Sequence, residues 1–317
     1  NAITIDSNGL NFQGDPDTYT VDYDTAGQAI NLVYADSTNG WIPTSDIAVA
    51  DEPVPTTQKA IFAYGTTGST VSLKNLVNSS GVVAADVTGV GTARTQLAAA
   101  GYGVDKAIFG YGFTNTAVSL SNLVNNSGTV ASDVSGVGTT RYELAAAGYS
   151  TDKAIFAYGW TGSAYSSVSN LVNSSGVIAS DVTGVGTART SLAAAEYGVD
   201  KAIFGYGYVD AYTSITNLVS NTGVVGSDVS GVGTSRSAPA AAGYGGDKAI
   251  FGFGSTGSVV SLTNLVNSSG VVASDVSGVG TARNQLAAAS YGGDKAIFGY
   301  GNTGSVTAVS NLVNSSG

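Results

Sequence analysis

The tetrapeptide Lys-Ala-Ile-Phe at residues 106–109 has five other copies in the chain, and their spacing decides the fold. Two more markers keep the same period: Gly-Val-Gly-Thr-x-Arg, first seen at residues 89–94, and Asn-Leu-Val, first seen at residues 75–77. Residues 59–317 therefore hold five full repeats of 47 or 48 residues and the first half of a sixth. The tetrapeptides begin at Lys59, Lys106, Lys153, Lys201, Lys248 and Lys295, and the arginines are Arg94, Arg141, Arg189, Arg236 and Arg283.

Each repeat has the pattern of four short strands separated by turns. One repeat gives strands at Leu97–Tyr102, Lys106–Tyr111, Val118–Val124 and Thr129–Val134, with a Gly-containing turn at 125–128. No segment has apolar residues at helical spacing, and the Leu-Ala-Ala-Ala run is too short to nucleate a helix. The sequence therefore predicts an all-β fold, with the small Ala strand at the crowded axis of a radial array.

Four strands in 47 residues are typical of one propeller blade. The order of Thr92-Ala93-Arg94, the Ala98–Ala100 strand and the Lys106–Gly112 strand resembles a kelch repeat. Two features depart from it: Gly-Tyr-Gly or a variant replaces the Gly-Gly doublet, and the fourth-strand Trp is missing. The resemblance implies a kelch-like β-propeller of about six four-stranded blades. A β-solenoid is the alternative, but its coils usually have about 20–30 residues.

The repeats do not complete a ring by themselves. The sixth stops at Gly317, before its fourth strand, and the first lacks its Ala-rich strand. Two explanations stay open. Ile30–Tyr34 and Ile47–Ala50 could each supply one strand, although Pro53 and Pro55 nearby cannot donate ladder hydrogen bonds. Alternatively, the repeats belong to a longer array.

Residues 1–58 form a different kind of sequence. They contain nine acids and no Lys or Arg, so they carry −9 of the net charge of −10. We expect an acidic β module at 1–45, a proline-containing connector at 46–58, and a nearly neutral repeat array at 59–317. The segments Ala2–Ile5, Thr25–Tyr34 and Asn39–Pro43 resemble a β module of marine bacteriophage tail-fibre and other virion proteins.

That resemblance implies a fibre or decoration protein at the virion surface, in an extracellular location. Residues 1–58 would contact other virion structural proteins, and the repeats would form the displayed end. We expect a homo-oligomer. A bacterial secreted or surface adhesin with a lectin-like propeller is an alternative.

Composition excludes several kinds of chemistry. The chain has no His, Cys or Met, so a Ser-His-Asp triad, a thiol nucleophile and the usual zinc, haem and copper sites are ruled out. With 12 cationic residues against 22 acids, nucleic-acid binding is not expected. No apolar run is long enough for membrane insertion. The pairs Asp15/Asp17 and Asp22/Asp24 lack a full calcium-loop signature. We predict no cofactor, no metal and no enzymatic activity.

Candidate binding residues lie where the repeats differ, in the loop after each Lys-Ala-Ile-Phe strand. Three neighbouring repeats carry aromatic residues there, and the others carry small polar ones. These residues could form a platform for a host glycan or another protein, or they could pack between blades or neighbouring subunits. The candidates are Phe113, Trp160, Tyr165, Tyr208, Asp210 and Tyr212.

Other polar residues have structural interpretations. The repeated Arg is expected to pair with a carboxylate or carbonyl between blades rather than to bind an anion. Each Asp-Lys pair marks a strand start, and each Asn-x-Ser a turn. Glu143 and Glu196 lie outside the repeated positions, so a glycan-degrading propeller enzyme is the second alternative.

Overall fold

A computed structural model describes residues 3–5, 9–12, 21–23, 31–43 and 59–317. The chain divides into two compact units, Asn1–Thr57 and Gln58–Gly317. The described residues contain no helix, and their strands form small antiparallel sheets of two or three strands. The prediction of an all-β fold is confirmed.

The described residues of the compact unit Asn1–Thr57 form two small sheets. Strand β1 (Ile3–Ile5) pairs with β2 (Val21–Tyr23), and β3 (Leu32–Asp36) pairs with β4 (Gly40–Pro43). Leu32–Tyr34, part of the strand that was suggested at residues 30–34, pair with β4 inside this unit rather than with a repeat. Residue 30 lies outside the described residues. The other suggested strand, Ile47–Ala50, lies outside the described residues, as do the side chains of the calcium candidates.

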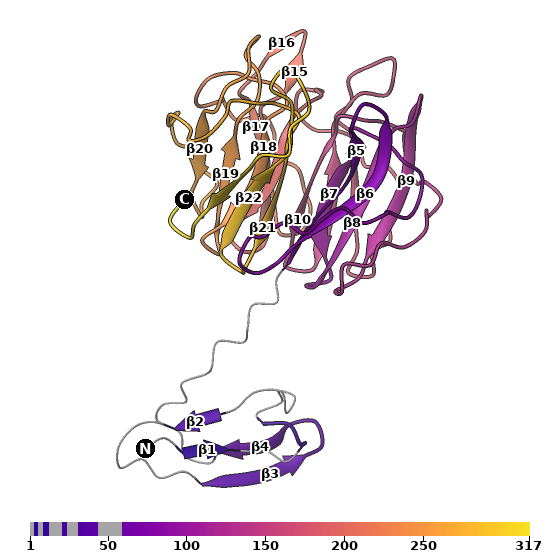
Figure 1. The fold of residues 1–317 in the computed structure, drawn as a ribbon. Helices are drawn as coiled ribbons and strands as arrows, with labels where there is room; N and C mark the ends of the chain where they lie inside the picture. Colours follow the sequence, from indigo (N-terminus) through magenta and orange to yellow (C-terminus); the bar gives the residue numbers. More distant parts are fainter. Residues whose placement is uncertain (1–2, 6–8, 13–20, 24–30, 44–58) are drawn as a thin grey trace. The chain divides into compact units, whose positions relative to one another are not determined.

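In the compact unit at residues 58–317, a two-stranded sheet is followed by five copies of one three-stranded sheet (Figure 1). We number these six repeated sheets, each with its loops, as units one to six. Unit one has β5 (Ala60–Thr66) and β6 (Thr70–Val77). Units two to six are β7 (Ala98–Tyr102), β8 (Lys106–Phe113) and β9 (Ala117–Val124); β10 (Ala145–Tyr149), β11 (Lys153–Ala157) and β12 (Ser169–Val172); β13 (Ala193–Tyr197), β14 (Lys201–Gly205) and β17 (Thr216–Val219); β18 (Ala240–Tyr244), β19 (Lys248–Gly252) and β20 (Thr263–Val266); and β21 (Ala287–Tyr291), β22 (Lys295–Gly299) and β23 (Ser310–Val313).

The expected fourth strand is not a regular strand. In unit two, the segment that was predicted as Thr129–Val134 meets β9 only at the single bridges Val124↔Val130 and Ser121↔Val134. The outer segment has one more residue between these bridges than β9 has, so the ladder is bulged. Asn122 donates from Nδ2 to the carbonyl of Ala131 and to Asp133 Oδ1, and these bonds satisfy polar groups at the bulge.

A second bulge explains the Gly-Tyr-Gly sequence. The register of β8 and β9 shifts between Gly110 and Gly112, and the intervening Tyr111 has a φ of 62°. A Cβ on Gly110 would lie 2.7 Å from Cζ of Phe156 in the next unit. The bulge turns the Tyr111 side chain inward, where it is fully buried. The Gly-Tyr-Gly sequence thus places a buried ring next to the following unit.

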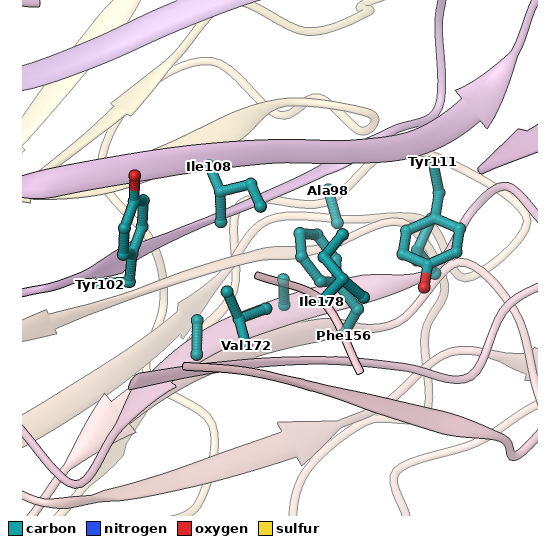
Figure 2. Close-up of a cluster of buried hydrophobic side chains, with 10 residues drawn as sticks. Ala98, Tyr102, Ile108, Tyr111, Phe156, Val172 and Ile178 are labelled. Atoms are coloured by element: carbon teal, nitrogen blue, oxygen red, sulfur yellow. The ribbon is translucent and has the colours of Figure 1, made fainter. Parts of the chain in front are cut away.

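The core lies between neighbouring units. Figure 2 shows one cluster, in which Ala98 and Ile108 of unit two pack with Phe156 and Val172 of unit three. The same aromatic contact joins each unit to the next, with ring centroids 5.1–5.4 Å apart. The pairs are Tyr64–Phe109, Tyr111–Phe156, Tyr158–Phe204, Tyr206–Phe251, Phe253–Phe298 and Tyr300–Phe62, the last joining unit six to unit one.

Hydrogen bonds join the Ala-rich first strands at both ends. Before the strand, the amide of Glu143 donates to the carbonyl of Gln96, and that of Ser191 donates to the carbonyl of Glu143. After the strand, the amide of Gly103 donates to the carbonyl of Asp152. The small Ala side chains let these strands approach, as the sequence predicted.

Candidate functional site

The predicted binding residues lie at one end of units two, three and four. Phe113 ends β8, Trp160 and Tyr165 lie in the loop after β11, and the remaining three lie in a hairpin after β14. That hairpin consists of β15 (Tyr208–Val209) and β16 (Ala211–Tyr212), and it turns at Asp210, which has a φ of 55°. Figure 1 shows the hairpin beyond the end of the neighbouring sheet.

The loops of units two and three meet through one additional residue. The ring of Phe113 lies 4.9 Å from that of Tyr142, which follows the repeated Arg of unit three. The backbone of Tyr142 bridges that of Trp160, and the Trp160 ring lies 4.8 Å from the Tyr165 ring. Four aromatic side chains therefore follow one another across two units.

The loops of units three and four meet at Asp210. The Tyr165 hydroxyl donates to Asp210 Oδ1 over 3.5 Å and lies 3.4 Å from the Asp210 amide, which donates to it. The Tyr208 ring packs edge-on against Tyr212, with centroids 5.6 Å apart. We call Phe113, Tyr142, Trp160, Tyr165, Tyr208, Asp210 and Tyr212 the aromatic row.

The row is partly open to solvent. Asp210 and Tyr212 are exposed, and the other members are half-buried. The structure thus brings five predicted residues into direct contact and connects Phe113 to them through Tyr142. Sequence reasoning missed Tyr142, although a signal was present: the equivalent positions hold Thr95, Thr190, Ser237 and Asn284.

The equivalent loops of the other units differ in chemistry. In unit five, Ser255 stands where unit three has Trp160, and its hydroxyl accepts from the amide of Gly257. In unit six, Asn302 occupies this position and accepts from the amide of Gly304. These side chains cap their own turns, so the aromatic row is confined to three successive units.

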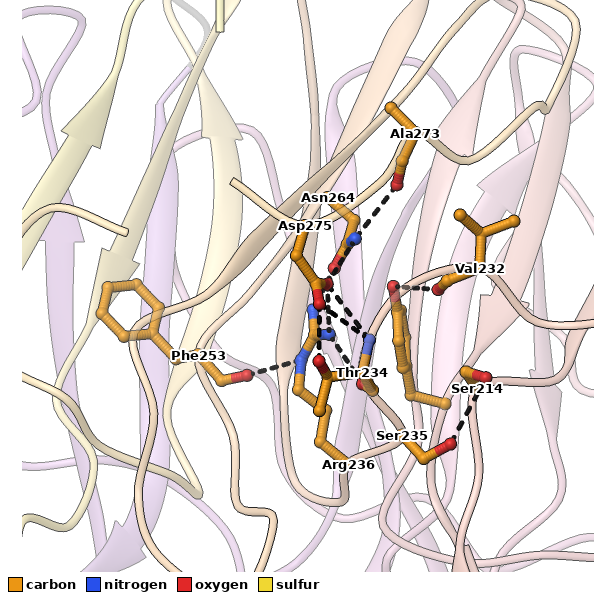
Figure 3. Close-up of polar contacts among 10 residues, drawn as sticks. Ser214, Val232, Thr234, Ser235, Arg236, Phe253, Asn264, Ala273 and Asp275 are labelled. Atoms are coloured by element: carbon orange, nitrogen blue, oxygen red, sulfur yellow. Dashed lines mark hydrogen bonds and ion pairs between the residues drawn. The ribbon is translucent and has the colours of Figure 1, made fainter. Parts of the chain in front are cut away.

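The repeated arginines are structural. Arg236 is fully buried, and it lies over the Tyr206 ring at 3.9 Å from the centroid (Figure 3). Its Nε donates to the carbonyl of Phe253, and its Nη2 donates to Asn264 Oδ1. Arg236 Nη1 lies 3.9 Å from Asp275 Oδ1. The prediction of carbonyl and carboxylate partners between units is confirmed, and a fully buried guanidinium is closed to an anion from solvent.

The carboxylate of each such cluster is held in its ionised form. Burial alone would raise the pKa of Asp275, but hydrogen bonds from Thr234 and Asn264, together with the charge of Arg236, bring the pKa below its usual value. Burial raises the pKa of Tyr206. The clusters therefore stay charged and paired near neutral pH, and they fix neighbouring units to each other.

The other repeated polar motifs also have structural roles. Lys106 Nζ lies 2.8 Å from Asp105 Oδ1, and four equivalent pairs exist, so the strand-start pairs are confirmed. Asn173 Oδ1 accepts from the amides of Ser175 and Val177 in the turn after β12. The Asn-x-Ser sequences are thus explained by turn chemistry.

Glu143 and Glu196 do not form a catalytic pair. Glu143 precedes β10 and accepts from Gln96, Thr190 and Ser191. Glu196 lies near the far end of β13, where burial, and secondarily the charge of Asp200, raises its pKa to about 7. The two carboxylates thus have separate surroundings at opposite ends of the first strands, which does not fit the paired carboxylates of a glycosidase.

Two hollows in the surface of the repeats lie away from the aromatic row. One of about 260 Å³ is bordered by Tyr102, Leu123 and Asn125, and one of about 90 Å³ by Gly148, Tyr149 and Glu196. Both are at the Lys end of the second strands. Within the described ranges there is no cluster of three or more acidic or other metal-binding side chains. No helix that could cross a membrane occurs in the part of the chain that the structure describes.

No protein-family model matches the chain, and no curated protein sequence matches it. Function therefore has to be argued from the sequence patterns and the geometry of the aromatic row.

Proposed function

We propose that the protein is a non-enzymatic attachment protein, in which the six units form a closed kelch-like β-propeller and the aromatic row binds a host-surface glycan. The contact of Tyr300 with Phe62, which repeats the contact made at the other five unit boundaries, supports closure. The missing regular fourth strands are compatible with it, because single bridges hold the outer segments in place.

The observation that carries the binding proposal is the joining of three loops into one row. Tyr165 and Asp210 belong to different units and are 45 residues apart, yet they share two hydrogen bonds. The ring of Phe113 packs against that of Tyr142, whose backbone pairs with that of Trp160. A connected, half-exposed aromatic surface on one side of the repeats is a feature of binding sites rather than of ordinary loops.

The chemistry of the row suits a sugar. Aromatic rings can cover the apolar C–H face of a pyranose, and the Asp210 carboxylate and the Tyr212 hydroxyl can bond sugar hydroxyls. The repeats carry almost no net charge, so hydrogen bonds and ring contacts supply the affinity rather than long-range attraction.

The virion placement is supported by the N-terminal resemblance. Residues 1–58 hold the tail-fibre-like segments and are chemically distinct from the repeats, as expected for an attachment module joined to a displayed one. Labelling of virus particles with an antibody against residues 59–317 tests this placement: label on the particle surface supports it, and labelling of bacterial cells alone contradicts it.

Binding is tested by applying the purified protein to immobilised bacterial surface polysaccharides. Trp160→Ala is expected to weaken binding at least tenfold, and Ser255→Ala, at the equivalent position of unit five, is expected to leave it unchanged. Circular dichroism confirms that both variants are folded. If a folded Trp160→Ala protein bound the polysaccharide as tightly as the unchanged protein does, the proposal would be refuted. Release of sugars from the polysaccharide would show an enzyme instead.

A further inference from the structure

The contacts between unit six and unit one are incomplete in a specific way. Each of the first four unit boundaries holds an aromatic ring, a Gly-Val-Gly-Thr-x-Arg segment, an Asn and an Asp. At the boundary between units one and two these are Tyr64, Thr92 with Arg94, Asn122 and Asp133. The complete set recurs around Arg141, Arg189 and Arg236.

Between units six and one, everything but the arginine segment is in place. Tyr300 contacts Phe62, and Asn75 donates to Asp86 Oδ1 over 2.8 Å, as Asn122 does to Asp133. Burial raises the pKa of Tyr300, and the nearby charge of Asp86 raises it further. Asp133 has the same effect on the pKa of Tyr64. A ring and a carboxylate thus face a position where a guanidinium lies at the other boundaries.

No residue of this sequence can fill that position. All five arginines of the chain are already buried over a ring at the other five boundaries, and residues 1–58 contain neither Arg nor Lys. An arginine segment outside residues 1–317 would be needed to supply a guanidinium here.

The neighbouring boundary lacks the complementary charge. Arg283 is fully buried over Phe253, and its hydrogen-bond partners are the carbonyls of Tyr300, Thr281 and Phe298. In the described structure it has no carboxylate where Arg236 has Asp275. A buried, uncompensated cation is costly, so this site favours an incoming Asp.

The strands that flank both incomplete boundaries are open. Leu312 on β23 is 55% exposed, whereas the equivalent Leu265 is half-buried. On the first strands, Ala287 of β21 and Ala99 of β7 are exposed, whereas Ala146 and Ala240 are buried. An outer segment against β23 and a first strand between β21 and β7 would cover these residues.

We propose that this surface binds a polypeptide segment with the repeat's own sequence, in the order found at Val271–Tyr291. Its first half would pair with β23 and bring the equivalent of Asp275 to Arg283. Its Thr-x-Arg would enter the space between Tyr300 and Asp86, and its Leu-Ala-Ala-Ala strand would lie between β21 and β7. One segment would thus satisfy the lone cation, the lone carboxylate and the open strand edges together.

The test is a binding titration of the full chain with a fluorescent peptide of the sequence of residues 271–291, followed by anisotropy. We expect saturable one-to-one binding. Peptides with Arg283→Ala or Asp275→Ala should bind at least tenfold more weakly. Asp86→Asn in the protein should weaken binding of the parent peptide. The same change should have little effect on binding of the Arg283→Ala peptide, because the two changes remove the same contact.

A second experiment uses an extended protein. Adding the same 21 residues after Gly317 should raise the unfolding temperature and abolish binding of the free peptide. Absence of peptide binding, equal binding of the parent and Arg283→Ala peptides, or undiminished binding to the extended protein would each overturn the proposal. Dimerisation that the peptide does not reverse would show instead that a second copy covers the surface. None of these outcomes depends on glycan binding.

Discussion

The ring of Tyr300 in unit six packs edge-on against Phe62 in unit one, with centroids 5.3 Å apart and planes at 78°. The two residues are 238 positions apart in sequence, yet they make the contact that Tyr158 and Phe204 make between units three and four. The repeats are thus joined end to end by their own core residues.

Truncation of this contact is expected to destabilise the repeats as a whole. Phe62 is buried, so Phe62→Ala should lower the free energy of unfolding by about 3–5 kcal/mol, through lost burial and a residual cavity. Urea unfolding followed by near-ultraviolet circular dichroism measures the change, with Phe204→Ala as the internal comparison. A loss below about 0.5 kcal/mol for Phe62→Ala alone would mean that units six and one do not support each other.

The buried arginine is expected to be more important for stability than any surface pair. Arg236→Ala leaves the buried Asn264 and the half-buried Asp275 without their arginine partner, and it should cost about 3–5 kcal/mol. Lys248→Ala removes an exposed pair with Asp247 and should leave the unfolding temperature unchanged within error. Similar losses for the two variants would refute the structural role of the arginine.

Glu196 is expected to make stability depend on pH. Its pKa is raised from 4.5 to about 7 in the folded protein, so the folded state holds a proton that the unfolded state releases between these values. Stability should therefore fall as pH rises from about 4.5 to 7 and then level off. Glu196→Gln should remove this fall and gain roughly 3 kcal/mol at pH 8. Parallel stability profiles for the two proteins would contradict the assignment.

Tyr142 is expected to contribute to binding although it lies outside the variable loops. Tyr142→Ser introduces the residue type of the equivalent Ser237 and removes the ring that contacts Phe113, while the backbone pairing with Trp160 is kept. Glycan affinity should drop about tenfold with folding retained, and Ser237→Ala should have no effect. Unchanged affinity for folded Tyr142→Ser would limit the site to units three and four.

The sequence was enough to predict the repeat period, the absence of helices from the residues that the structure describes, and the positions of the first three strands of each repeat. Alternation and Gly turns are local signals. The sequence could not show that the outer segment is bulged, since the deciding bonds join Asn122 to Ala131 and Asp133 across a turn. Nor could it place Tyr142 beside Phe113, because that contact depends on how units two and three pack. Five of the six predicted row residues touch each other directly because their loops follow equivalent strands.

The central claim is that the aromatic row holds the ligand, and Trp160 can report on it directly. The chain has two tryptophans, so Trp41→Phe leaves Trp160 as the only source of tryptophan emission. Titration of this variant with an oligosaccharide from the bound polysaccharide should change the Trp160 emission, with the same Kd as an independent binding measurement. Saturated binding with no change in the intensity or wavelength of that emission would contradict the account.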